Sequence, residues 1–252
     1  MESTLKRRGR ASFSLGIACP MANEADTAER FVREVLRQCG GFREVQMFVV
    51  LDRATTDTTR AILEQVAQAE PRLRVVWAPE NRCVVDAYIR GYREALAAGC
   101  DWILELDSGF SHQPGDIPRF FDRFEEGYDC VFGTRFGPGG RLTNSSFKRR
   151  IVSRGGTLLA NVLLGTRLTD MTSGFELFSR RALQKVLDRG IESRGHFFQT
   201  EIRFYCSRLH IAEVPIHYKS ASPRLSGAAI SEAFRGLWKL YSESKQPREN
   251  SL

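Results

Sequence analysis

Short apolar runs alternate with amphipathic stretches along the first 106 residues, and few folds accommodate such an alternation. The apolar runs have the length of buried strands, and the stretches between them place apolar side chains at helical spacing. Parallel strands need a crossover long enough to hold a helix, so this pattern favours parallel pairing. It predicts an α/β fold, a Rossmann-like sandwich in which helices flank a central, mainly parallel sheet. We expect the four strands at residues 13–19, 45–51, 73–77 and 102–106.

Polar residues follow the first two predicted strands. Pro20 closes the first strand ahead of Asn23 and Glu24, and Asp52 follows the second. Ligands bind at the carboxyl ends of strands in open α/β sheets, so we interpret Asp52 as an acceptor for a nucleobase or ribose and Asp57 as a helix cap. No G-x-G-x-x-G motif follows the first strand and the sequence has no P-loop. Dinucleotide oxidoreduction and P-loop ATP chemistry therefore lose support.

The fourth predicted strand places Asp107 where the chain breaks into Ser108 and Gly109. Chemistry on a nucleotide diphosphate usually employs two acidic groups near a divalent ion, but residue 109 has no side chain. The sequence therefore leaves open what a site at Asp107 can still do.

Arginines that could bind phosphate occur in the second half of the chain. Arg135 stands at the base of a Gly-rich loop, after a strand predicted at residues 130–133. Arg149 and Ser153 are four positions apart, so a helix would place both on one face, where they could clamp a phosphate. The alternative is an exposed basic turn before an apolar segment at residues 158–164.

Two acidic residues stand further along. Asp170 begins a break between helical stretches at residues 170–175, which could be a turn or a site loop. Glu201 falls near the first turn of a predicted helix. The helix dipole favours a carboxylate there even without catalysis.

The composition suits one folded domain. The chain has 252 residues, of which 42% are hydrophobic and 10% aromatic, enough to bury a full core. Its net charge of +7 favours anionic ligands or a membrane surface as partners, with a solvated basic surface as the alternative. The six cysteines form no CxxC pair and the four histidines are scattered. We therefore expect core cysteines in a reducing cytosol, and no zinc site.

The two ends of the chain differ from the middle. Residues 1–11 form a basic arm, which we interpret as a solubilising tail rather than a lipid or nucleic-acid contact. Residues 227–252 hold an amphipathic helix and tail, whose apolar stripe at positions 230, 234, 237, 238 and 241 favours core packing over membrane anchoring, although it suits an interface too. No run reaches the ~20 apolar residues of a membrane span. We expect a cytoplasmic protein that is either soluble or peripheral at the cytoplasmic membrane face.

In their order and spacing these motifs resemble the family 2 glycosyltransferases of GT-A fold, in particular the dolichyl-phosphate mannosyltransferase and polyprenyl-phosphate glycosyltransferase group. The similarity covers residues 14–240 and is most specific over residues 133–175. Its marks are Pro20 with Asn23-Glu24, the turn from Asp52 to Asp57, Asn81, Leu106-Asp107 with Ser111-His112, Gly133-Thr-Arg135, Arg149 with Ser153-Arg154, Asp170 to Phe175, and Phe198-Gln199-Thr-Glu201.

The resemblance implies a single GT-A domain over residues 12–226 that moves a sugar, with inversion, from a GDP- or UDP-sugar to a polyprenyl phosphate or a soluble small molecule. If the acceptor is a lipid phosphate, that phosphate is the nucleophile, and catalysis consists of positioning and of neutralising the leaving diphosphate. The matching positions are Pro20, Asn23, Glu24, Asp52, Asn81, Ser108, Arg135 and Arg224 for the nucleotide sugar, Arg149, Ser153 and Arg154 for the acceptor phosphate, and Asp107, Asp170 and Glu201 for catalysis.

Several positions depart from the pattern of the family. Its Asp-x-Asp motif is Asp107-Ser-Gly109 here, so Mg²⁺ or Mn²⁺ would rely on Asp107, with Ser111 as a weak additional ligand. Arg53 and Cys83 replace a usual Asp and Gly, and the element around Arg224 lacks its glycine. The chain could work without metal, using Asp107 with Arg135 and Arg224 to hold the diphosphate.

A degenerate relative that binds nucleotide sugars or a partner protein without turnover is the alternative. The retention of Asp107, Arg135, Arg149, Ser153 and Glu201 favours the enzyme. Nucleic-acid binding is not expected, because the aromatic residues fall in predicted core rather than on a basic face. The sequence leaves the oligomeric state open.

Overall fold

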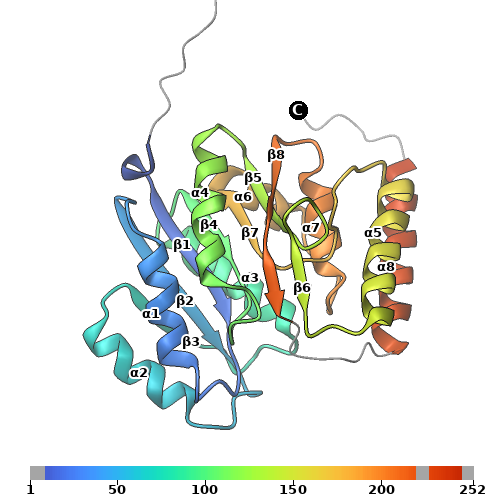
Figure 1. Cartoon of the computed structure of the whole chain (residues 1–252). Coiled ribbons are helices and arrows are strands. Elements are labelled where there is room, and N and C mark those ends of the chain that lie inside the picture. The colour runs from blue at the N-terminus through green and yellow to red at the C-terminus, as the bar shows by residue number, and fades with distance from the viewer. Residues whose placement is uncertain (1–8, 220–226, 246–252) are drawn as a thin grey trace, which may run out of the picture.

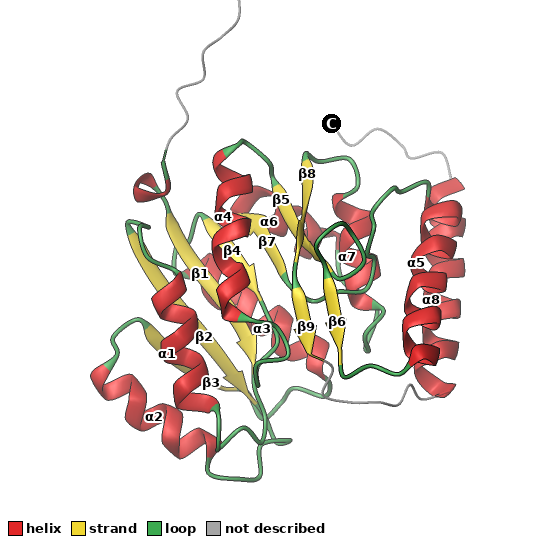
Figure 2. Ribbon diagram, in the orientation of Figure 1, coloured by secondary structure: helices red, strands yellow, loops and turns green. Residues whose placement is uncertain are grey.

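The structure, a computed structural model, describes residues 9–219 and 227–245. Seven strands form one sheet in the order β3-β2-β1-β4-β7-β5-β8, and Figures 1 and 2 show helices on both sides of it. Its strands are β1 (Ser14–Pro20), β2 (Glu44–Leu51), β3 (Leu73–Trp77), β4 (Trp102–Glu105), β5 (Cys130–Thr134), β7 (Glu176–Ser179) and β8 (Ile211–Pro215). The mainly parallel α/β sandwich is therefore confirmed, and the strand ends differ from the predicted ones by a residue or so.

Two hydrophobic cores hold the helices to the sheet. Alternate residues of a strand point to opposite faces, so Ile17 of β1 joins the core on one face and Ala18 the core on the other. The first face is covered by α1 (Ala28–Gln38), α2 (Thr59–Ala69) and α4 (Ile117–Glu125), and the second by α3 (Val84–Ala97), α6 (Arg180–Arg189) and α7 (Phe198–Cys206). Helices thus cover both faces of the sheet, as a parallel sheet requires.

Strand β7 was not predicted from the sequence. It runs antiparallel between β4 and β5, and it begins with the charged Glu176, which is fully buried. The guanidinium of Arg203 on α7 donates to Glu176 Oε1 at 2.7 Å and supplies the opposite charge that such burial needs. The strand has only four residues, and its buried carboxyl group is paired with an arginine of a helix distant in the sequence. It therefore lacks the alternation of apolar and polar residues from which a strand is predicted.

Two further helices stand beside the sandwich, at the right of Figure 1. Helix α5 (Phe147–Leu164) packs against α8 (Gly227–Lys245), and a third core joins them to α7 through Leu164, Phe204, Leu237 and Leu240. A small parallel sheet, β6 (Arg141–Thr143) with β9 (His217–Lys219), lies near the foot of α5. None of the helices in residues 9–219 and 227–245 is long and apolar enough to cross a membrane.

The apolar stripe of α8 is only partly core. Leu237 is buried, but Phe234 and Trp238 are 59% and 66% exposed. The preference for core packing is thus wrong for these two side chains, because α5 and α7 cover one side of α8 and leave the other to solvent.

The described parts of the two predicted terminal segments pack against the domain. Arg10, which we assigned to a basic arm, lies in a 3-10 turn (Arg10–Ser12) and donates to Glu125 of α4 at 2.8 Å. All six cysteines are free, and five of them are buried, as expected for core residues.

Candidate active site

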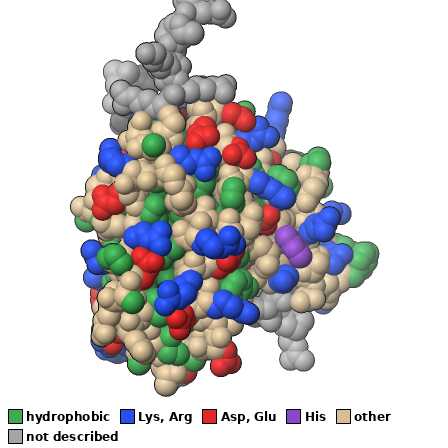
Figure 3. Space-filling model, turned by 60° about the vertical axis from the view of Figure 1, so that its left-hand side comes forward, with side chains coloured by type: hydrophobic (Ala, Val, Ile, Leu, Met, Phe, Trp, Pro, Cys, Tyr) green, Lys and Arg blue, Asp and Glu red, His purple; other side chains and the backbone are tan. Residues whose placement is uncertain are grey.

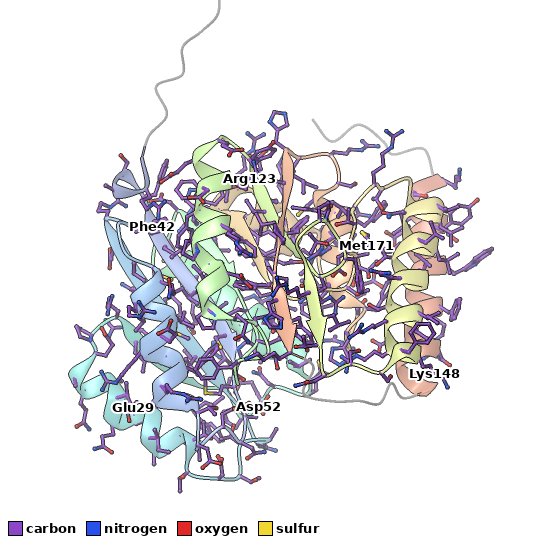
Figure 4. All side chains as sticks on the ribbon, in the orientation of Figure 1. Glu29, Phe42, Asp52, Arg123, Lys148 and Met171 are labelled. Atoms are coloured by element: carbon purple, nitrogen blue, oxygen red, sulfur yellow. The ribbon has the colours of Figure 1, made fainter. Side chains whose placement is uncertain are left out.

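The site lies where the strand order of the sheet reverses. β1 pairs with β2 on one side and with β4 on the other, so the loops that follow β1 and β4 diverge and leave room for a ligand. Pro20 ends β1, and Asp107 follows β4 by two residues. Figure 4 shows Asp52, just after β2, at this same lower end of the molecule, with Lys148 of α5 at the same level.

Asp107 is held by neighbours that leave its charge in place. Tyr88 of α3 donates its hydroxyl to Asp107 Oδ1, and the Asp107 N–H donates to His112 Nδ1 at 3.1 Å. Burial lowers the pKa of His112 to about 4, so the imidazole is neutral at pH 7. His112 therefore orients the loop without neutralising Asp107, whose side chain stays 39% exposed.

Gly109 is tied to Glu24 of the β1–α1 loop. Its φ of +70° lies in the left-handed region that glycine adopts at little cost. A Cβ at this position would stand 2.4 Å from Glu24 Oε1, far inside van der Waals contact. The carboxylate of Glu24 therefore occupies the space that a side chain at position 109 would need.

The residues of this site fit a divalent cation in one way. Among the described residues no three His, Cys, Asp or Glu side chains come together to hold a metal ion, so a cage made of protein ligands alone is absent there. Mg²⁺ bound with nucleotides commonly takes one or two carboxylates and completes its shell with phosphate oxygens and water. Asp107, two residues before Gly109, and Glu24, whose carboxylate lies against Gly109, are the carboxylates that could take this part.

Hydrogen bonds connect the loops that follow β1 and β2. Asn23 donates to Ala54 O at 2.8 Å and accepts from Thr56 N–H at 2.9 Å, while Asp52 accepts from Ala54 N–H at 2.8 Å. Asp57 accepts from Thr59 N–H at 2.9 Å at the start of α2, which fits the predicted structural role. Asn23 and Asp52 thus hold the two loops together beside the carboxyl ends of β1 and β2.

Asn81 stands before α3 with its side-chain Nδ2 buried and without a hydrogen-bond partner within the described residues. A buried amide left unpaired costs free energy. Such an atom is a donor that a ligand could satisfy, and the place of Asn81 in a nucleotide site stays a prediction. The predicted site residue Ser108 is half-buried between Asp107 and Gly109.

Arg135 is the centre of a buried polar cluster. It is 8% exposed, and its Nε and Nη2 donate to the two oxygens of Asp170 at 2.7 and 2.8 Å. Nη2 also donates to Thr172 at 2.6 Å and to Ser153 of α5 at 3.3 Å. Among the described residues Nη1 has no protein acceptor, so part of the fork is available to a ligand. Arg203 donates to the carbonyl of Asp170 from beneath.

Tyr218 of β9 connects this cluster to the loop of Asp107. It bridges to His112 in antiparallel fashion, and its ring lies 5.6 Å from the Arg135 guanidinium carbon. Burial and the charge of Asp107 raise the pKa of the Tyr218 phenol, while Arg149 and Arg135 lower it. One carboxylate and two guanidiniums therefore surround this hydroxyl. Arg154 lies over the ring of Phe136, as Arg135 does.

The structure does not bring the three predicted catalytic carboxylates together. Asp170 is fully buried and its charge is matched by Arg135, so the pKa of Asp170 is lowered despite burial, through Arg135 and Arg203. Glu201 is 2% exposed and accepts from the N–H groups of Glu192 and Ser193 at 2.9 and 3.0 Å. Both carboxylates hold other parts of the protein, and neither contacts Asp107. Arg224, also predicted, lies outside the described residues.

Four residues that we did not predict stand in or directly behind the site. Tyr88 and Tyr218 contact the Asp107 loop, and Glu105 accepts from Tyr92 and from Gln199 of α7 below it. Burial and the nearby Glu176 raise the pKa of Glu105. A carboxylate within an apolar strand was the available signal for Glu105. Gln199 stands two residues before Glu201, the residue of the same motif that we chose.

The sheet order, the switch-point carboxylate and the neighbouring guanidiniums define a glycosyltransferase of GT-A fold. The chain belongs to glycosyl transferase family 2, whose model matches residues 17–187. It is 33% identical over 190 residues to the undecaprenyl-phosphate mannosyltransferase of Micrococcus luteus, which covers 73% of this chain and 78% of that protein. It is 28% identical over 223 residues to the polyprenol monophosphomannose synthase of Mycolicibacterium smegmatis, with 86% and 83% covered.

Solved structures agree on the fold. Glucosyl-3-phosphoglycerate synthase from Mycobacterium tuberculosis, in complex with Mn²⁺, UDP and glucosyl-3-phosphoglycerate, matches with a TM-score of 0.66 at 19% identity over 95% of this chain and 83% of that one. The same enzyme with Mn²⁺ and UDP-glucose gives a TM-score of 0.65 at 20% identity, with 95% and 82% covered.

Proposed function

We propose that this glycosyltransferase moves a sugar from a nucleoside-diphosphate sugar to the phosphate of a polyprenyl lipid at a membrane surface, with inversion at the anomeric carbon. The two named relatives act on such lipids by their names, and each is matched over more than three quarters of its length. The donor would lie across the ends of β1, β2 and β4, against Pro20, Asn23, Glu24, Asp52, Asn81, Ser108 and Asp107.

Helix α5 is the observation that carries the choice of acceptor. Its inner face presents Ser153, which is bonded to the Arg135 cluster. Its outer face presents a stripe of exposed apolar side chains at helical spacing. These are Phe147, Ile151, Leu158 and Val162, exposed by 78, 55, 67 and 71%. One helix thus joins a phosphate-binding face to an apolar one, as a lipid phosphate requires.

The exposed residues Phe234 and Trp238 of α8 lie on the neighbouring helix and enlarge this apolar surface. We call the set of six side chains the α5–α8 surface. Lys148, Arg154 and Arg235 are exposed on the same two helices, which suits an anionic bilayer surface. By contrast, Figure 3 shows acidic and basic side chains interspersed on the α1–α2 side, where pairs such as Arg33–Glu29 and Arg60–Glu64 form.

In the proposed reaction an oxygen of the acceptor phosphate attacks the anomeric carbon. The bond from that carbon to the donor diphosphate breaks, and its electron pair leaves on the nucleoside diphosphate. Attack from the opposite face inverts the configuration. A phosphate is already anionic at neutral pH, so no general base is needed, and Arg135, Arg149 and Ser153 orient it. A divalent cation at Asp107 would supply positive charge to the leaving diphosphate.

For the other two predicted catalytic residues we propose positioning roles. Asp170 fixes the guanidinium of Arg135 by accepting two hydrogen bonds from it. Glu201 fixes the segment before α7 through Glu192 and Ser193, and α7 carries Gln199 beneath the site.

The test is sugar transfer by the full-length protein. It is incubated with UDP- and GDP-sugars and vesicles that contain polyprenyl phosphate, and nucleoside diphosphate release and the lipid product are measured. A lipid-linked sugar of inverted configuration supports the proposal. Release only with soluble acceptors would overturn the acceptor, and nucleotide binding without any release would favour the degenerate binder.

A further inference from the structure

The turn that follows Asp107 contains a phenylalanine in a backbone conformation that this residue seldom adopts. Gly109 and Phe110 have φ values of +70° and +59°, both in the left-handed region. Glycine enters this region at little cost, whereas a bulky side chain there is an outlier. The other non-glycine residues with positive φ among the described residues are Asn23 and Asn144, and asparagine tolerates it. The backbone at Phe110 is therefore strained, so other contacts must hold it.

Helix α1 holds the ring of Phe110. The ring lies edge-to-face against Phe31, with ring centroids 5.2 Å apart and planes at 90°, and the guanidinium carbon of Arg30 lies 4.7 Å from its centroid. Phe31 is fully buried in the first core, and Phe110 packs against that core. Aromatic pairs of this geometry are stabilising beyond the apolar area that they bury. Packing on α1 thus offsets the strain in the backbone.

The turn has few other restraints between Asp107 and Phe110. Ser108 and Gly109 donate no hydrogen bond to any of the described residues. Beyond them, Gln113 donates its side-chain amide to the carbonyl of Phe110. The conformation of the two residues that follow Asp107 therefore depends on the place where Phe110 is held.

We propose that Phe110 is a positioning residue of the donor site. Its ring, packed on α1, keeps the strained turn in the conformation that presents Asp107 and Ser108 to a nucleoside diphosphate. A turn released from α1 would populate other conformations, and the affinity for the nucleotide would fall with the fraction of molecules that keep the competent one. This inference rests on the proposed donor site, but not on the choice of acceptor.

The experiment compares two half-buried phenylalanines that pack against the same core, Phe110 and Phe42. The full-length variants are Phe110→Ala, Phe110→Gly and Phe110→Leu, with Phe42→Ala and Phe42→Gly as matched controls. Phe42 contacts Phe121 at 4.8 Å between ring centroids, and Figure 4 shows it at the upper end of the molecule, away from Asp52. Thermal melting, the affinity for UDP and GDP by calorimetry, and the KM values for donor and acceptor are measured for each protein.

Strain at position 110 predicts a reversal in the order of stabilities. Glycine ordinarily destabilises relative to alanine, because it gains more freedom in the unfolded chain, so Phe42→Gly should melt below Phe42→Ala. Phe110→Gly should instead melt above Phe110→Ala, because glycine adopts positive φ without strain. The same order at both positions would contradict the strained turn, and the inference with it.

Nucleotide binding tests the positioning role itself. Phe110→Ala and Phe110→Gly should weaken binding of the nucleotide about tenfold and raise the KM for the donor, but not that for the acceptor. Phe110→Leu should restore most of the affinity, because leucine again fills the space against Phe31, and both Phe42 variants should bind as wild type does. Folded Phe110→Gly with wild-type affinity would overturn the inference, since the ring would then serve packing alone.

Two further outcomes separate this inference from the proposed function. Wild-type protein that binds neither UDP nor GDP would contradict the donor site, and this inference with it. Nucleotide binding that depends on Phe110, without sugar transfer to polyprenyl phosphate, would support the inference and contradict the acceptor alone.

Discussion

At the scale of single residues, the site combines a carboxylate that forms no ion pair with Lys or Arg among the described residues and a guanidinium that is paired with a carboxylate. Asp107 accepts from Tyr88 and stands beside a neutral His112, so its charge is directed but not cancelled. Arg135 is the opposite case, since Asp170 matches its charge and fixes its plane. The first arrangement suits a residue that meets a cation, and the second a residue that must keep its geometry among anions.

Asp107→Asn should lower kcat/KM for sugar transfer about 100-fold or more, because it removes a charge opposite the reacting diphosphate. Tyr88→Phe should lower it about tenfold, by releasing one hydrogen bond to a charged group. Steady-state kinetics at fixed donor concentration measures both. Normal activity of Asp107→Asn would show that the active centre lies elsewhere.

Asp170→Asn should reduce the free energy of unfolding by about 3–5 kcal/mol, because it leaves the buried Arg135 without its counter-charge. Urea unfolding monitored by circular dichroism measures the loss. The control is Glu29→Gln, which breaks the exposed pair with Arg33 and should change stability by no more than about 1 kcal/mol. Equal effects would mean that Arg135 is more hydrated than its burial indicates.

His112 should make the fold sensitive to mild acid. Its pKa is lowered to about 4 in the folded protein from 6.5 when exposed, so the unfolded chain binds the extra proton first as pH falls. Stability should therefore decline from about pH 6.5 toward pH 4, by about 3 kcal/mol from this residue. Urea unfolding across this range should show a shallower decline for His112→Asn, whereas exposed His196→Asn should follow wild type. Identical slopes in all three proteins would contradict the assignment.

At the scale of elements, α5 shows how one helix can serve two surroundings. The sequence predicted Arg149 and Ser153 on one helix face, with a basic turn before an apolar segment as the alternative, and the structure has a single helix that runs through Gly155 and Gly156. Glycine is a poor helix former, and packing against α8 and α7 overrides its low propensity. The same packing turns Ser153 inward and the apolar stripe outward.

Replacing Phe234 and Trp238 by Ser together should weaken binding to vesicles of anionic lipid about tenfold or more, since each buried aromatic contributes about 1.5–3 kcal/mol. Co-sedimentation at low and high salt measures this, and salt should weaken binding of the wild type as well. Trp77→Ser is the matched control, because Trp77 is 37% exposed but lies on β3. Unchanged binding of the double variant would place membrane contact elsewhere.

At the scale of the whole molecule, the sequence predicted the layers better than the site. Alternating apolar runs specify β1 to β4 and their helices, since each element must bury one face locally. Asp52, Asp107 and Arg135 could be proposed because strand ends meet at one edge. Tyr88 and Tyr218 could not, because they reach the Asp107 loop from a helix face typical of core and from a short strand of the separate β6–β9 sheet. The relation of Glu24 to Gly109 depends on the meeting of two distant loops.

The two faces of α5 also set how the reaction should respond to the amount of lipid. An enzyme docked through the α5–α8 surface meets its acceptor in two dimensions, so its rate follows the mole fraction of polyprenyl phosphate in the bilayer rather than the bulk concentration. Adding vesicle lipid at constant acceptor should then slow transfer by surface dilution. The donor arrives from water, at the open end of the sheet, and is unaffected. The rate of transfer would thus depend on the surface density of the acceptor in the membrane, because one helix carries both the acceptor-binding face and the membrane-binding face.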